Sequence, residues 1–189
     1  MLGAAEPSKA RTPASGVSLL ANANAVHGVI GDTAPNKEGR MHAIEFLKHE
    51  HQKAKAAFGK VLHASSTERG KLWTELKPEL EAHEEIEETC LYGPISQEAS
   101  DPMLRDWKRR HQEEIKRVDA VIKQVDGLGN DDGRRLEKLN EIHKSLEAHI
   151  REEEDEIFPR ISRAWDQSRL EQAGTKMEQM HSAQKRRAA

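Results

Sequence analysis

The sequence predicts an all-α protein built around an up-down-up-down four-helix bundle. Charged residues make up 33% of the chain, hydrophobic residues 35% and aromatic residues only 4%, a mixture typical of helices with long solvated faces. Apolar residues recur at intervals of three and four in four long segments. Short turn sequences separate these segments, and helices joined by short connections pack as antiparallel neighbours.

The first two helices are expected over residues 37–63 and 67–92. The apolar stripe of the first contains a histidine, in the series Ile44, Leu47, His51, Ala54, Phe58 and Val61 or Leu62. Ser66 is the expected N-cap of the second helix, and Gly93-Pro94 is its expected end. Pro78 lies inside the second helix and could kink it.

The third helix is expected to begin at Asp101-Pro102, since a capping residue followed by proline is a typical helix start. Its stripe also contains a histidine, in the series Leu104, Trp107, His111, Ile115, Val118, Ile122 and Val125. After a turn at 127–130, the fourth helix should run from Asp131 or Asp132 to about Phe158. Pro159 is expected to kink it or end it.

A fifth helix is expected from Asp166 to about Gln184 and should pack across the outside of the bundle. It presents one apolar face, made of Leu170, Ala173, Met177 and Met180. The predicted organisation is therefore a flexible tail at 1–37, a bundle with its packing helix at 38–182, and a basic tail at 183–189. The first of these segments is rich in Ala, Ser, Pro, Gly and Asn, which favours disorder.

The charge balance and the cysteine content exclude several classes of function. The chain has 30 basic and 33 acidic residues and a net charge of −3, so nothing indicates nucleic-acid binding. Its apolar runs are too short to span a membrane. Cys90 is the single cysteine, so no internal disulfide can form, and we expect a cytoplasmic protein.

Polar residues interrupt the apolar stripes in a repeated pattern. Two helices carry a histidine and a glutamate four residues apart, namely His83 with Glu87 and His149 with Glu153. Residues at this spacing lie on the same helix face, and a buried charge is costly unless something pairs with it. With His51 and His111, four histidines and two carboxylates face one core, which indicates a metal site for iron, manganese or zinc.

A lone histidine in an apolar stripe is more often a buried residue with an ordinary hydrogen-bond partner. Here each of the four stripes contains a histidine, and this repetition favours metal binding. His143 borders the fourth stripe, and Glu84 and Glu114 lie close to predicted ligands, so each of the three could join the site. Cys90, Tyr92 and Trp107 are expected to be packing residues.

Three stretches, 43–51, 80–88 and 146–154, together with His111, resemble the hemerythrin family in its broad form, the hemerythrin HHE cation-binding domain. The resemblance extends over about residues 40–180. It implies a non-haem centre of two iron ions. By position, the bridging carboxylates would be Glu87 and Glu153, and the terminal ligands would be His51 and His83 for one iron and His111 and His149 for the other.

The sequence departs from the family's oxygen carriers at one position, because Ile115 stands where they have a second histidine on the third helix. This departure argues against simple reversible oxygen transport and favours a more open iron. One hypothesis is a protein that binds dioxygen, peroxide or nitric oxide, or senses iron or redox state. A second is a peroxidase, catalase-like enzyme or ferroxidase, and a third is a bundle whose polar core is only structural, with zinc or no metal.

Overall fold

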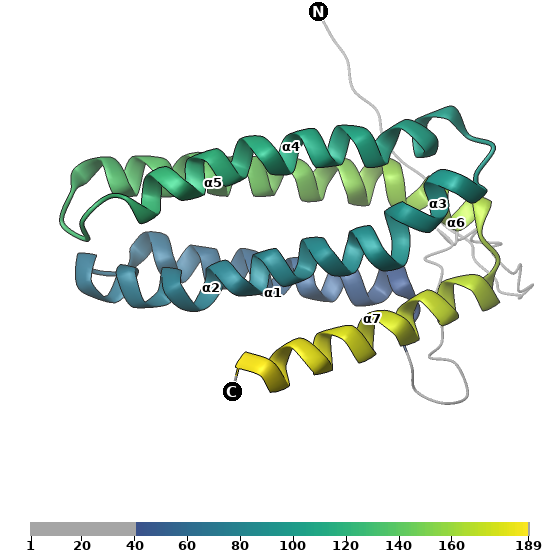
Figure 1. The fold of residues 1–189 in the computed structure, drawn as a ribbon, viewed down its shortest axis with the longest axis horizontal. Helices are drawn as coiled ribbons and strands as arrows, with labels where there is room; N and C mark the ends of the chain where they lie inside the picture. Colours follow the sequence, from purple (N-terminus) through teal and green to yellow (C-terminus); the bar gives the residue numbers. More distant parts are fainter. Residues whose placement is uncertain (1–40, 189) are drawn as a thin grey trace, which may run out of the picture. The chain divides into compact units, whose positions relative to one another are not determined.

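The protein is described by a computed structural model over residues 41–188 (Figure 1). Four long helices alternate in direction: α1 (Ala43–His63), α2 (Ser66–Glu87), α4 (Pro102–Asp126) and α5 (Gly133–Glu152). No strand occurs in this part of the chain. The predicted all-α, up-down-up-down bundle is confirmed, while the predicted tail at 1–37 lies outside the described residues.

The core consists of two apolar clusters that lie at different heights along the bundle. Helix α1 packs on α2 and α4 packs on α5, and α1 also contacts α5. One cluster includes Leu47, Trp107 and Phe158, and the other includes Phe58 and Ile142. Along α1, α4 and α5 the predicted ligands fall between these two clusters, so the polar residues are enclosed by apolar packing on both sides.

Two helices continue past the points where proline was expected to end or kink them. Helix α2 passes through the π-helical segment η1 (Glu88–Tyr92) into α3 (Gly93–Glu98), and α5 passes through η2 (Glu153–Ile157) into α6 (Phe158–Ala164). The predicted end at Gly93-Pro94 is therefore wrong. The Gly93 N–H bonds to the Glu88 carbonyl, five residues earlier, and this wider turn precedes the proline, which has no N–H to donate.

Helix starts agree with the expected capping residues at two of three places. The Asp101 carboxylate accepts from the Met103 N–H, and the Asp132 carboxylate accepts from the Arg134 N–H. The N-cap of α2 is Ser65 rather than the predicted Ser66, whose hydroxyl donates to Asp131 instead. Helix α1 begins at Ala43, later than the predicted start near residue 37. Residues 41 and 42 are not helical.

The C-terminal helix α7 (Gln167–Ala188) packs against α1, α2 and η1, which confirms the predicted packing helix. Leu170, Ala173 and Met177 are buried in this contact. Gly174 allows the close approach, because a Cβ at this position would lie 2.3 Å from the Met41 carbonyl oxygen. No helix among the described residues is long and apolar enough to cross a membrane.

Candidate metal centre

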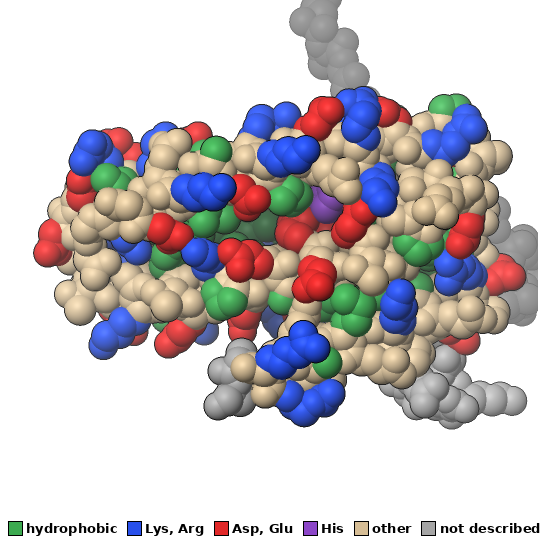
Figure 2. Space-filling view, in the orientation of Figure 1, with side chains coloured by type: hydrophobic (Ala, Val, Ile, Leu, Met, Phe, Trp, Pro, Cys, Tyr) green, Lys and Arg blue, Asp and Glu red, His purple; other side chains and the backbone are tan. Residues whose placement is uncertain are grey.

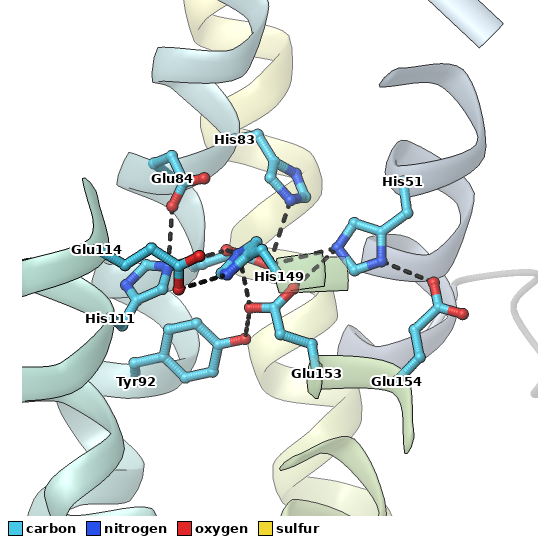
Figure 3. A network of polar contacts seen from close by, with 10 residues as sticks. His51, His83, Glu84, Tyr92, His111, Glu114, His149, Glu153 and Glu154 are labelled. Atoms are coloured by element: carbon cyan, nitrogen blue, oxygen red, sulfur yellow. Dashed lines mark hydrogen bonds and ion pairs between the residues drawn. The ribbon is translucent and has the colours of Figure 1, made fainter. Parts of the chain in front are cut away.

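The six predicted ligands come together in the middle of the bundle (Figure 3). They come from four helices, and Glu153 is the first residue of η2. Five of them are at most 5% exposed, and the side chain of the sixth, His83, is 11% exposed. The six are His51, His83, Glu87, His111, His149 and Glu153.

The carboxylate of Glu87 lies at the centre of this group, and its two oxygens face different histidines. Oε1 lies 3.2 Å from Nε2 of His83 and 3.7 Å from Nε2 of His51. Oε2 lies 3.7 Å from Nε2 of His111 and 4.0 Å from Nε2 of His149. One carboxylate thus connects two pairs of imidazoles.

The carboxylate of Glu153 has the same two-sided arrangement. Its Oε2 lies 3.2 Å from Nε2 of His51, and its Oε1 lies 3.1 Å from Nε2 of His149. Each glutamate therefore presents one oxygen to the His51 side and the other to the His149 side. This is the arrangement expected of carboxylates that bridge two cations.

Two sets of donor atoms in the described residues are compact enough to hold a metal ion. One set consists of His51, His83 and Glu87, and the other of Glu84, Glu87, His111 and His149. Within each set the donor atoms lie within 4.8 Å of one another. Glu87 belongs to both sets, and Glu84 joins the second, where its Oε2 lies 2.9 Å from Nε2 of His111.

Many of the converging atoms have no hydrogen bond, although they are buried and close together. Atoms without a hydrogen bond include Nε2 of His51, His111 and His149, Oε2 of Glu84 and Glu153, and both carboxylate oxygens of Glu87. A buried polar atom without a partner destabilises a protein by about 1–3 kcal/mol. The residues present therefore fit a pair of bound cations, which would give these donors a partner.

Electrostatics hold these side chains in charged forms. Burial lowers the pKa of His51, but its contacts with Glu153 and Glu87 raise the pKa more, to about 10. Burial and the charge of Glu87 raise the pKa of Glu153, whereas His149 and His51 lower it further, to about 2. Protonated imidazoles thus balance the carboxylates, and a bound cation would take over that role.

A carboxylate outside the central group orients the ring of His51, and a second one lies near His149 without a hydrogen bond to it. Nδ1 of His51 lies 2.8 Å from Oε1 of Glu154, in hydrogen-bond geometry, and Nδ1 of His149 lies 3.4 Å from Oε2 of Glu114. When Nδ1 donates its proton to a carboxylate, Nε2 is left free as a metal donor. Glu154 lies in an acidic run at 152–156, so nothing in the sequence singled it out as a partner of His51.

Tyr92 takes part in the site rather than serving only as a packing residue. Its hydroxyl donates a hydrogen bond to Oε1 of Glu153, and its ring lies 4.9 Å from the ring of His111. The predicted packing role is confirmed, since Tyr92 is buried in the apolar core, but the prediction missed the hydrogen bond to Glu153. The residue type itself could have indicated this contact, because a buried tyrosine hydroxyl usually has a hydrogen-bond partner.

Other candidates stay outside both donor sets. His143 packs against the ring of Phe58 at 5.1 Å and belongs to neither set. His63 lies at the end of α1, where its Nδ1 contacts the Gly59 carbonyl at 2.7 Å. Cys90 is buried under α7, and its thiol contacts the Met180 sulfur at 3.4 Å, in line with the expected packing role.

Comparison with known proteins agrees with this site. The family model described as hemerythrin HHE cation binding domain matches residues 42–161. A similar solved structure is the crystal structure of a hemerythrin HHE cation binding domain-containing protein from Mycobacterium kansasii, with 26% sequence identity and a TM-score of 0.64. The match covers 76% of this chain and 88% of that chain. A search of the curated proteins found no match.

Proposed function

The chain belongs to the hemerythrin HHE cation-binding domain family, and on this basis we propose that it binds a pair of iron ions and a small ligand beside them. The observation that carries the proposal is the two-sided placement of Glu87 and Glu153, whose oxygens face both pairs of histidines. A structural polar core without metal would leave most of these buried atoms without a hydrogen bond.

The donor chemistry supports iron. His51 and His83 would serve one ion, and His111 and His149 the other, with the two glutamates shared between them. Two imidazoles with carboxylates are the ligand type of non-haem iron sites that keep open positions. Bound iron would supply a redox-active Lewis acid at this place.

Glu84 is proposed as a further ligand on the His111 side. Its Oε2 is buried, has no hydrogen bond and lies in the second donor set. Because Ile115 cannot coordinate a metal, Glu84 would provide a terminal oxygen donor on this side of the centre. Its carboxylate charge also offsets the positive charge of the second ion.

With these ligands, the protein would bind dioxygen, nitric oxide or a related small molecule, or report iron or redox state. The alternative is an enzyme that acts on hydrogen peroxide or oxidises ferrous iron. The alternative draws support from Ile115, since the family's oxygen carriers have a second histidine at this position and this chain does not. Turnover of hydrogen peroxide by the purified protein would distinguish the two.

Metal quantitation on the purified protein, combined with an absorption spectrum, tests the proposal. We expect iron in a ratio of two ions per chain and the near-ultraviolet bands of an oxo-bridged diferric pair. Zinc as the main metal, or a single ion per chain, would contradict the proposed centre.

A further inference from the structure

Three glutamates lie at an opening in the surface between α2 and α4, next to the candidate metal centre. Figure 2 shows this hollow, with acidic side chains and a histidine at its edge. Apart from Ser145, its uncharged lining residues are aliphatic and offer no ligand to a cation. The ionisable residues of the lining include no lysine or arginine and are Glu81, Glu84, Glu114 and His149.

Two of these glutamates lie directly against histidines of the centre (Figure 3). Oε2 of Glu114 lies 3.4 Å from Nδ1 of His149, and Oε2 of Glu84 lies 2.9 Å from Nε2 of His111. His149 is only 5% exposed, and its Nδ1 has no hydrogen bond. Oε2 of Glu84 is also buried without a hydrogen bond. Behind the acidic opening, therefore, lie donor atoms that are free to take a cation.

Other glutamates around the centre are already paired. Four of them adjoin a proposed ligand in the sequence, and each contacts a basic side chain: Glu50 with Lys53, Glu88 with Lys108, Glu152 with Arg110 and Glu154 with His51. Among the described residues, Glu84 and Glu114 form ion pairs only with histidines of the centre. The negative charge at the opening is thus less compensated than the charge elsewhere around the centre.

Charge at the opening is present near neutral pH and attracts cations. The contact with His149 holds the pKa of the Glu114 carboxyl below its usual range, so this group is ionised. A cleft lined by charge of one sign concentrates counter-ions and raises association rates by about 10–10³. Carboxylate oxygens suit a hydrated divalent cation, and an imidazole behind them adds a donor that suits iron or zinc.

We infer that Glu81, Glu84 and Glu114 form the entry port through which divalent cations such as Fe²⁺ reach the centre. Glu81 and Glu114 hold the cation at the opening, and it then passes to Glu84 and the two histidines behind it. The inference rests on the proposed function, because it names the route by which the proposed centre is filled. It assigns Glu81 and Glu114 a role in the rate of metal uptake.

Rapid mixing of the metal-free protein with Co²⁺, whose visible absorption changes on binding, measures loading without depending on activity. Glu81→Lys should slow loading about tenfold. The final cobalt content should stay unchanged, because Glu81 belongs to neither donor set. Glu75→Lys is the matched control, since Glu75 is an exposed residue of α2 outside the opening, and it should load like the unmodified protein. Equal loading rates in the two variants would overturn the inference.

Glu114→Gln separates a residue of the port from a residue that holds the bound metal. It should slow Co²⁺ loading, while the release of bound Co²⁺ to a strong chelator keeps its rate. Glu113→Gln is the control on α4, because the Glu113 carboxylate pairs with Arg109 at 2.7 Å and lies outside the opening. The control should change neither rate. Faster release with unchanged loading in Glu114→Gln would overturn the inference for this residue.

Salt dependence and metal content keep the outcomes distinct. Higher ionic strength should slow loading of the unmodified protein more than loading of Glu81→Lys, because salt screens the attraction of the opening. Metal content is measured on every sample. Unmodified protein that takes up no metal would refute both the proposed function and the port. Two ions per chain, with equal loading rates in the unmodified protein and Glu81→Lys, would refute only the port.

Discussion

The hydroxyl of Tyr92 donates a hydrogen bond to Oε1 of Glu153, the same oxygen that faces Nε2 of His149. Burial and the nearby charges of Glu153 and Glu87 raise the pKa of Tyr92 well above its usual value. The phenol therefore stays protonated and remains a donor over the whole neutral range. This contact holds the Glu153 carboxylate in the orientation in which its two oxygens face opposite sides.

Replacing Tyr92 with phenylalanine should weaken metal binding without abolishing it. The variant keeps the ring but loses the hydrogen bond that orients Glu153, and loss of such an outer contact lowers metal affinity by about 10–100-fold. Competition with a chelator of known affinity measures the change. Ser96→Ala is a suitable control, because its hydroxyl bonds only to the Gly93 carbonyl in the described contacts. Equal affinities for Tyr92→Phe and the unmodified protein would contradict the orienting role.

Replacing a proposed ligand should remove metal, whereas replacing a histidine outside the centre should not. Glu153→Ala deletes a carboxylate shared by both sides, and His83→Ala deletes one of the imidazoles on the Glu87 Oε1 side. His63→Ala is the control, since His63 is exposed and contacts a backbone carbonyl. Elemental analysis of the three purified variants should give low metal for the first two. The assignment fails if all three carry the same amount.

Helical periodicity explains why the six proposed metal ligands could be predicted from the sequence. His51, His111 and the two pairs at 83/87 and 149/153 lie in regular α-helix or at its end, where a repeat of 3.6 residues places them on the core face. Tyr92 and Glu154 lie in the π-helical segments, where an extra residue per turn changes which side chains face inward. Nothing in the sequence marks those segments except Pro94 and Pro159, which suggested helix ends.

Removing the metal should lower the stability of the protein near neutral pH. Binding to the folded state alone contributes ~4 kcal/mol when free metal exceeds its dissociation constant about a thousandfold. Without metal, Glu87 and Glu153 lose their shared cations while they remain buried. Thermal unfolding with and without a strong chelator measures the effect. An unchanged melting temperature in protein proven to be metal-free would contradict a structural contribution of the centre.

Metal binding should release protons, and metal affinity should fall as the pH is lowered. Burial lowers the pKa of His51, but Glu153 and Glu87 raise it to about 10, so this imidazole is protonated in the metal-free protein near neutral pH. A metal must displace that proton. Calorimetry in two buffers with different ionisation enthalpies counts the protons released, and a value of zero would contradict the prediction.

The same pKa shifts give the metal-free protein an acidic stability optimum. The raised pKa of His51 adds stability that is complete below its unfolded value of 6.5 and is lost as the pH rises towards about 10. The lowered pKa of Glu153 adds stability above its unfolded value of 4.5, which is lost as the pH falls towards about 2. Chelation should therefore destabilise the protein more in alkaline than in mildly acidic buffer.

The contact between α7 and the start of α1 depends on a glycine. A Cβ at Gly174 would lie 2.3 Å from the Met41 carbonyl oxygen and 2.8 Å from the Ala43 nitrogen. Both are backbone atoms, so Gly174→Ala must push the helix away, and overpacking of this kind destabilises by about 1–3 kcal/mol. Gly59→Ala is the matched control in α1, because nothing lies within 4 Å of the new methyl group. Since alanine favours a helix interior by about 0.5–1 kcal/mol over glycine, the control should be more stable than the unmodified protein in denaturant unfolding. If Gly174→Ala also gained stability, α7 would not be held against α1 by this close approach.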